Sequence, residues 1–569
     1  MNSNRLFRFR ITTIIFFVVC FGLLLITRLF FVQVVHGEWF RERAGEQYIT
    51  PSNYAFERGS IFFQKKNSDL LGGGVVTTGF KVAINSNKIS DPEAVYLALS
   101  EITDLDKDKF LKTIAKKDSY EEVVHRLTKE LADRVAVLNL PGVSVFKEKW
   151  RFYPGANLAS HVLGIMGFKG DEFSGRYGIE RSYEDVLARG RESLNVNFFA
   201  EVFANISKSL LGESSKEGDL ILTIEPSVQG FLENELKNLR ETWKVDLAGA
   251  IIMNPKTGSV YAMSSKPDFD PNDFSKEDLS VFVNPSVENI FEFGSVMKPL
   301  VMSGALDIGA VTPETTYQDT GSVIVHNKVI ENFDGKGRGK VNMQEVLNKS
   351  LNTGMVFVAG KMGQDQVRNY LFAYGLGQPT GIDLPGEVNG SVQNLYSKRD
   401  LEYATAAFGQ GVALTPIQAA RAFAALGNGG YLVTPHLVEK IHYDSRPEKV
   451  LEYPPSITAV IKPETSETIT RMLVGVADNL SSGTAKIENY SVAAKTGTAQ
   501  VAKEDGRGYY DDQHLHSMFA YFPAYDPQFL VFFYLKNPKG VQYAASSLTP
   551  SMMKTARFLI NYYEVSPDR

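Results

Sequence analysis

Residues 248–263, AGAIIMNPKTGSVYAM, join two apolar runs through the turn-forming sequence Asn-Pro-Lys-Thr-Gly at 254–258. Asparagine, proline and glycine supply the backbone geometry of a tight connection, so this segment predicts a β-hairpin. Strand-like runs return only late in the chain, at 491–494 and 529–535. A sheet whose strands come from both ends of a domain, with helices between them, is an α+β arrangement. We therefore expect an α+β fold.

Around the hairpin, helical periodicity alternates with short extended runs. The predicted helices of the second half of the chain are at 226–243, 295–309, 344–362, 415–426 and 550–563. Upstream the pattern is mixed, with helix-like patches at 106–117 and 120–137 and extended runs at 80–84 and 220–223. A chain of 569 residues is too long for one core. We expect a mixed α/β spacer or docking domain at 36–225 and a second domain at 226–569.

The N-terminus predicts a membrane anchor. Three arginines in the first ten residues precede an apolar stretch at 11–35 that contains one further charge, Arg28. The stretch is long enough to cross a bilayer if Arg28 snorkels to the interface. The positive-inside rule then predicts a cytoplasmic tail at 1–10, one transmembrane helix at 11–35 and an extracytoplasmic remainder. A cleaved signal peptide is the alternative, but no small-x-small cleavage site follows the apolar stretch.

The amino-acid composition excludes several classes of partner and site. The formal net charge of −5 gives no basic face, which argues against nucleic acid as a main partner. The one cysteine, Cys20, lies in the apolar N-terminal stretch, so a disulfide framework and a cysteine-rich metal site are excluded. None of the eight histidines has HExxH spacing. We expect no metal and no cofactor, and chemistry that depends on hydroxyl, lysine and carboxylate groups.

Three short motifs follow one another in the second domain. They are Ser295-Val296-Met297-Lys298, Ser350-Leu351-Asn352 and Lys495-Thr496-Gly497-Thr498. Each is weak alone, because an S-x-x-K sequence is expected about once or twice by chance in a chain of this length. Lys256-Thr257-Gly258 also repeats the third motif, and we interpret it as the hairpin turn. The order and combination of the three motifs make them candidates for one site.

The first and third motifs suit an activated serine nucleophile. Residues i and i+3 share a helix face, so Lys298 lies one turn beyond Ser295. A serine hydroxyl needs a base, and a lysine serves as one if burial and a neighbouring cation lower its pKa. Lys495 is the candidate for that cation. The alternative is an N-cap serine followed by a solvated lysine.

The remaining motif residues suit substrate binding. Ser350 would relay protons, and the Asn352 amide would hold a peptide-like substrate through one donor and one acceptor. If the third motif forms an edge strand, Gly497 lets the substrate approach the backbone while the Thr496 and Thr498 hydroxyls bind a carboxylate. The alternatives are a helix cap at the second motif and a strand-end turn at the third.

Through these motifs and several flanking segments, the chain resembles the class B, monofunctional penicillin-binding proteins over nearly its whole length. The flanking segments include RGSI at 58–61, RFYP at 151–154, HVLG at 161–164, GRYGIE at 175–180, FDPN at 269–272 and FGQG at 408–411. The resemblance implies an N-terminal anchor, an elongated non-catalytic pedestal, and a C-terminal transpeptidase domain whose antiparallel sheet is covered by helices.

The resemblance also implies a reaction. Ser295 would attack the D-Ala-D-Ala bond of a peptidoglycan stem peptide and form an acyl-enzyme, with Lys298 as general base. The cleft would be lined by Ser350 and Asn352, and the substrate carboxylate would be held by Lys495, Thr496 and Thr498. The backbone N–H groups of Ser295 and Thr498 would form the oxyanion hole. An amine from a neighbouring stem would resolve the ester, and β-lactams would acylate Ser295 as donor mimics.

Within the family, segments 350–354 and 380–387 look more like the division (septal) branch than the elongation branch. That branch implies a polytopic membrane glycan polymerase and divisome proteins as partners. The alternatives are an elongation-type transpeptidase, a catalytically silent penicillin-binding scaffold or sensor, and a D,D-carboxypeptidase. The chain departs from the family pattern at Phe293, where a proline is usual, at Ala494, where a glycine is common, and around Gln64, where Asp-Arg is absent.

Overall fold

The computed structural model describes residues 57–169, 172–189, 216–444, 446–480, 485–503 and 508–569, with a few residues between 16 and 28. Contacts divide the chain into two compact units. Unit 1 comprises residues 1–57 and 77–150, and unit 2 comprises residues 58–76 and 151–569. The predicted boundary between 36–225 and 226–569 stays a prediction.

The predicted cytoplasmic tail at 1–10 and most of the predicted anchor at 11–35 lie outside the described residues. In the part of the chain that the structure describes, we find no helix with the length and apolar character needed to cross a membrane. The transmembrane helix therefore stays a prediction from the sequence.

Unit 1 packs short helices against three strands. Its elements are the C-terminal part of β2 (Leu70–Ile84), η3 (Ser86–Lys88), α3 (Pro92–Ser100), α4 (Lys107–Ala115), β3 (Glu121–Leu127), α5 (Lys129–Val137) and most of β4 (Val143–Phe152). The helix expected at 106–117 is confirmed as α4. The helix expected at 120–137 is wrong in its first half, because residues 121–127 pair antiparallel with β2 and Thr128 caps the helix that follows.

The N-terminal part of unit 2 contributes strands to a sheet with both parallel and antiparallel neighbours, here called the mixed sheet. The unit 2 strands of the mixed sheet lie in the order β15-β14-β7-β1-β2, where β1 is parallel to β7 and β7 is antiparallel to β14. The further elements are β1 (Ile61–Gln64), α6 (Ser160–Leu163), β5 (Met166–Lys169), β6 (Glu172–Gly175), α7 (Gly178–Ser182), α8 (Glu184–Leu187), β7 (Gly218–Leu222), β14 (Val438–Tyr443) and β15 (Lys449–Val450). Beside this sheet the buried Glu180 carboxylate pairs with Arg58 and Arg151. Segments before residue 226 and the later β14 thus share one folded unit.

The second sheet of unit 2, here called the antiparallel sheet, has the strand order β16-β17-β18-β8-β9, and all neighbouring strands are antiparallel. The strands are β8 (Leu247–Met253), β9 (Val260–Lys266), β16 (Ala493–Ala502), β17 (Tyr509–Phe522) and β18 (Phe529–Lys536). The hairpin expected at 248–263 is confirmed as β8 and β9, and Lys256-Thr257-Gly258 lies in its turn. The strand β17 was not predicted, because both of its faces are buried from Leu515 to Phe522 and no alternating pattern results.

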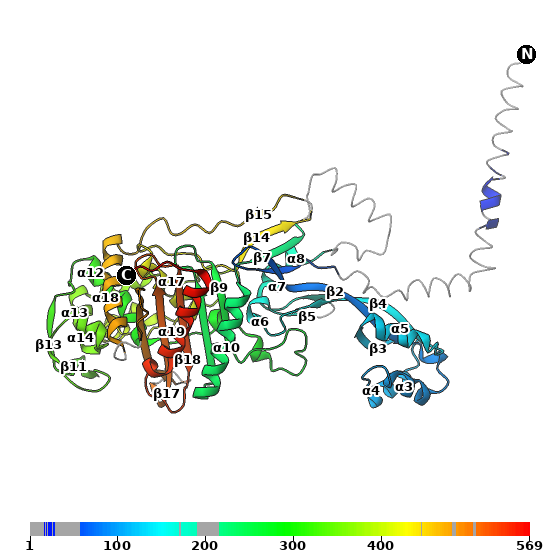
Figure 1. Ribbon diagram of the computed structural model, residues 1–569, viewed down its shortest axis with the longest axis horizontal. Coiled ribbons are helices and arrows are strands. Elements are labelled where there is room, and N and C mark those ends of the chain that lie inside the picture. The colour runs from blue at the N-terminus through cyan, green and yellow to red at the C-terminus, as the bar shows by residue number, and fades with distance from the viewer. Residues whose placement is uncertain are drawn as a thin grey trace, which may run out of the picture. The chain divides into compact units, whose positions relative to one another are not determined.

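Helices cover both faces of the antiparallel sheet (Figure 1). One core joins α10 (Pro226–Trp243) and α19 (Ala544–Tyr563) to strand residues such as Ile252 and Phe533. The other core joins the opposite strand residues, such as Phe519 and Phe532, to α12 (Lys298–Asp307), α14 (Asn352–Met362), α17 (Pro416–Gly427) and α18 (Pro463–Asn479). The arrangement confirms an antiparallel sheet covered by helices.

The remaining elements of unit 2 lie between the hairpin and α18. They are η4 (Leu279–Phe282), α11 (Pro285–Glu288), η5 (Gly294–Met297), β10 (Thr316–Asp319), β11 (Ser322–Val325), β12 (Lys328–Glu331), β13 (Gly339–Asn342), α13 (Met343–Asn348), α15 (Gln364–Ala373), η6 (Gln393–Tyr396) and α16 (Asp400–Ala406). β10 pairs with β13, and β11 pairs with β12. The single helix expected at 344–362 is wrong. It breaks between α13 and α14, where Ser350 has a φ of 52°, in the left-handed region that ends a helix.

Candidate active site

Ser295 lies in a tight turn that leads into a helix. Residues 294–297 form η5, a 3-10 turn, and the Lys298 backbone N–H donates to the Ser295 carbonyl oxygen. In 3-10 geometry the side chains at i and i+3 eclipse one another, so Ser295 and Lys298 share a face. Gly294 has a φ of 65°, a value that a residue with a side chain rarely takes. The expected helix start is therefore confirmed, with a 3-10 first turn.

The edge strand β16 packs directly on this turn. A Cβ added to Gly497 would lie 2.6 Å from the Phe293 carbonyl oxygen and 3.0 Å from the Val296 nitrogen. The Ser517 hydroxyl donates to the same Phe293 oxygen at 2.9 Å and links the turn to β17. Because Gly497 has no side chain, β16 can pack closely against η5, the turn that carries Ser295. The sequence alone did not reveal this role of Gly497.

Lys298 is fully buried and bonded to the second motif. Its Nζ donates to the Ser350 carbonyl oxygen at 2.6 Å, to the Ser350 Oγ at 3.2 Å and to the Asn352 Oδ1 at 2.8 Å. Burial, followed by repulsion from the Lys495 cation, lowers the pKa of Lys298 well below its ordinary value. The alternative of an N-cap serine with a solvated lysine is wrong for this reason.

Lys495 also bonds to the Ser350 side chain. Its Nζ donates to the Ser350 Oγ at 3.1 Å and to the Thr496 carbonyl oxygen at 2.8 Å. Burial lowers the pKa of Lys495 to about 7. The Ser350 oxygen thus accepts from the amino groups of both lysines, which leaves its own proton available to a third partner. Three segments that lie far apart in the sequence converge on one hydroxyl.

The threonines of the third motif lie on β16 beside these lysines. Thr496 and Thr498 are half-buried, whereas Gly497 between them is buried. The Thr498 Oγ1 accepts from the Ala544 N–H at 3.0 Å, at the start of α19. Its hydroxyl proton therefore remains available to a ligand. β16 ends the strand order of the antiparallel sheet, so the third motif lies on an edge strand, which is the condition for the carboxylate-binding interpretation of this motif.

The site also includes residues that the motifs did not reveal. The Asn352 Nδ2 donates to the Glu331 carbonyl oxygen at 2.8 Å, which orients the Asn352 Oδ1 toward Lys298. Asn332 accepts from the Thr353 N–H, and Asp319 accepts from the Thr353 hydroxyl. Asp319 ends β10, Glu331 ends β12 and Asn332 follows it, and sequence spacing alone carries no signal for these partners. Within the described residues no cluster of three His, Cys, Asp or Glu side chains is arranged to hold a metal ion.

Comparison with known proteins identifies the family. Residues 248–556 match the penicillin-binding protein transpeptidase domain, and residues 57–221 match the penicillin-binding protein dimerisation domain. The chain belongs to the class B penicillin-binding proteins. Among the relatives of this penicillin-binding protein, Stage V sporulation protein D of Bacillus subtilis is 33% identical over 562 residues, or 96% of this chain and 85% of the relative. Peptidoglycan D,D-transpeptidase FtsI of Escherichia coli is 28% identical over 430 residues, or 75% of this chain and 69% of the relative.

Solved structures of penicillin-binding proteins have the same fold. Penicillin-binding protein 2X of Streptococcus thermophilus aligns with a TM-score of 0.70 at 21% identity, over 90% of this chain and 80% of that one. Penicillin-binding protein 3 of Mycobacterium tuberculosis, complexed with aztreonam, aligns with a TM-score of 0.68 at 22% identity, over 90% and 97% of the two chains. The expected transpeptidase fold is thereby confirmed.

Proposed function

We propose that this chain is a serine-type peptidoglycan D,D-transpeptidase that cross-links stem peptides through an acyl-enzyme on Ser295. The observation that carries the proposal is the convergence of Lys298 and Lys495 on the Ser350 hydroxyl, beside the turn that holds Ser295. The transpeptidase domain match and the D,D-transpeptidase relatives support the reaction class.

Lys298 is the proposed base of the acylation step. Because burial and Lys495 lower its pKa, the neutral amine is populated at a lower pH than that of a solvated lysine. The Ser295 oxygen attacks the carbonyl of the penultimate D-alanine and its proton passes to Lys298. The peptide bond then breaks, and the proton reaches the departing D-alanine amine through Ser350. An acceptor amine attacks the ester, loses a proton by the same route, and restores the serine hydroxyl.

The third motif is the proposed site for the substrate carboxylate. Lys495 supplies a cation while it is protonated, and Thr498 has a proton to donate because its oxygen accepts from Ala544. The Thr496 hydroxyl lies on the same strand. The backbone N–H groups of Ser295 and Thr498 are the proposed oxyanion hole, because β16 packs against η5 at Gly497, the residue before Thr498. Asn352 is proposed to contact the peptide backbone of the donor.

The cellular setting is also a proposal. The apolar stretch at 11–35 supports a single-pass anchor in the cytoplasmic membrane, with the N-terminus inside and the catalytic unit outside. Segments 350–354 and 380–387 support a role in septal wall synthesis, with a polytopic glycan polymerase and divisome proteins as partners. A transpeptidase of sporulation is the second candidate, favoured by the identity with Stage V sporulation protein D. Depletion in growing cells separates the two, because only the septal role predicts a block in division.

Labelling with a fluorescent penicillin tests the reaction. We expect purified protein to become covalently labelled, Ser295→Ala to lose all labelling, and the exposed-serine control Ser280→Ala to label normally. Retained labelling in Ser295→Ala would disprove the assignment of the nucleophile. Mass spectrometry of products from a pentapeptide-bearing glycan then tests the acceptor. Dimeric peptides support a transpeptidase, whereas trimmed monomers alone would indicate a D,D-carboxypeptidase.

A further inference from the structure

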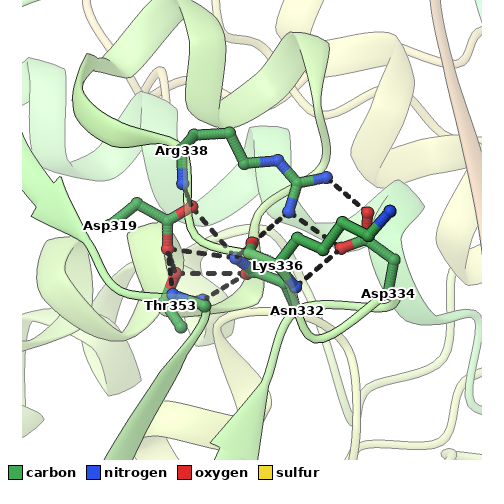
Figure 2. Close-up of polar contacts among 7 residues, drawn as sticks. Asp319, Asn332, Asp334, Lys336, Arg338 and Thr353 are labelled. Carbon is green, nitrogen blue, oxygen red and sulfur yellow. Dashed lines mark hydrogen bonds and ion pairs between the residues drawn. The ribbon is translucent and has the colours of Figure 1, made fainter.

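A buried carboxylate near the site accepts five hydrogen bonds. Asp319, which is 2% exposed, lies at the end of β10. Its Oδ1 accepts from the Gly321 N–H at 3.1 Å, the Asn332 Nδ2 at 3.0 Å and the Thr353 Oγ1 at 2.8 Å. Its Oδ2 accepts from the same Asn332 Nδ2 at 3.1 Å and from the Arg338 N–H at 3.0 Å. Figure 2 shows Asp319, Asn332 and Thr353 converging in this network.

This network caps the helix of the second motif. The N-cap residue of α14, Leu351, has no side chain that can accept a hydrogen bond. The Thr353 N–H, one of the unpaired donors of the first turn, instead donates to the Asn332 Oδ1 at 3.2 Å. The Asp319 carboxylate accepts from the Thr353 hydroxyl at the same helix end, where the helix dipole favours negative charge. Asp319 at the end of β10 and Asn332, the residue after β12, thus serve as the cap of α14.

The cap is connected to the proposed base through the neighbouring residues. Glu331 directly precedes Asn332, and its carbonyl oxygen accepts from the Asn352 Nδ2 at 2.8 Å. This contact fixes which end of the Asn352 amide faces the site, and the Oδ1 accepts from the Lys298 Nζ at 2.8 Å. A displacement of Asn332 therefore moves both its own contact with α14 and the carbonyl that orients Asn352.

We propose that Asp319 is a positioning residue for acylation, which holds Asn332 so that α14 presents Asn352 to Lys298. The inference rests on the proposed function of Ser295 and Lys298. A carboxylate is required because all five contacts need an acceptor. In Asp319→Asn an NH2 group replaces one of the two carboxylate oxygens. Because the Asn332 Nδ2 donates to both oxygens of Asp319, the new NH2 group faces another donor whichever way the amide is turned.

The same loop offers a matched control. Asp334 lies two residues beyond Asn332, and its carboxylate pairs with the Arg338 guanidinium through two contacts of 2.8 Å. Arg338 contacts Asp319 through its backbone N–H instead. Asp334 is exposed, and its bonds stay within the loop, with the Lys336 N–H and Arg338 as its partners (Figure 2). Asp334→Asn makes the same chemical change without touching α14.

The test is the pH dependence of penicillin acylation in the full chain. We expect Asp319→Asn to lower the second-order acylation rate constant about tenfold or more, equivalent to about 1.4 kcal/mol per factor of ten. We also expect the midpoint of its pH profile to shift by about half a unit or more. Loss of the Asn352 acceptor disfavours the charged form of Lys298, whereas looser packing weakens the desolvation that lowers its pKa, and Lys495 is the charged group that faces Lys298 from β16. Asp334→Asn should keep the wild-type rate and midpoint.

A merely structural role would lower the amount of folded protein and leave the pH midpoint unchanged. An unchanged midpoint in folded Asp319→Asn would therefore overturn the proposal. If that variant does not fold, Thr353→Val and Thr353→Ser replace it, because only serine keeps the hydroxyl that donates to Asp319. Thr353→Val must then shift the midpoint and Thr353→Ser must restore it, and equal midpoints would overturn the proposal. Loss of labelling in Ser295→Ala tests the proposed function separately.

Discussion

Replacement of Gly497 by alanine tests how closely β16 must approach the nucleophile turn. The added Cβ would lie 2.6 Å from the Phe293 carbonyl oxygen, 2.7 Å from the Ser517 Oγ and 3.0 Å from the Val296 nitrogen. Ordinary contact begins at 3.4 Å, so the strand and η5 would have to separate by about 0.8 Å. A misplacement of about 1 Å can cost about a hundredfold in rate. Overpacking of this kind typically costs about 1–3 kcal/mol of stability.

Two measurements on purified Gly497→Ala follow from this geometry. We expect the rate of labelling by fluorescent penicillin to fall about a hundredfold, and the unfolding midpoint without ligand to fall as well. Gly230→Ala in α10 is the matched control, because its Cβ would meet only the Leu158 Cδ1 at 3.8 Å. If Gly497 served only the approach of substrate, the ligand-free stability would not change. An unchanged unfolding midpoint, or a wild-type labelling rate, would refute the role of Gly497 in η5 packing.

Three further outcomes follow from the structure. Lys298→Gln should slow acylation about 10²- to 10⁴-fold, the range of a general base, while circular dichroism shows a retained fold; a fall of less than tenfold would contradict the assigned role. Since folding lowers the pKa of Lys495 to about 7 from 10.5, the unfolded state binds an extra proton between these values, so stability should rise with pH across that window. The lowered pKa of Lys298 contributes to the same rise in stability. In Lys495→Met the unfolding midpoint should therefore rise less steeply from pH 7 to 9.5 than in the wild type, and equal slopes would contradict this prediction. Glu180→Ala should lower the free energy of unfolding by about 3–5 kcal/mol, because it leaves the buried Arg151 guanidinium without a carboxylate and Arg58 with Glu184 alone. Asp365→Ala at an exposed pair should cost about 1 kcal/mol or less in the same denaturant titration.

Local patterns predicted the elements that carry their own signals. The hairpin at 248–263 and the helix at 226–243 agree with the structure, because turn residues and a proline at the first helical position act within a few residues. The prediction failed where a distant partner decides the conformation. Residues 121–127 form a strand only because β2 lies beside them. Residues 344–362 form two helices because Ser350, which bonds to Lys298 and Lys495, takes a left-handed conformation.

The sequence by itself determined the chemical groups of the site, their order along the chain and the covalent spacing of Ser295 from Lys298. Spacing of three residues sets a shared face through the geometry of one helical turn, and no other part of the chain is needed for that. Only the tertiary structure decided that Lys495 meets Ser350, that Gly497 makes room for η5, and that Asp319 and Asn332 cap α14. Hydrogen bonds join Thr353 to Asn332 across 21 residues and Lys495 to Ser350 across 145 residues. The low pKa of each lysine arises mainly from burial rather than from its neighbours in sequence.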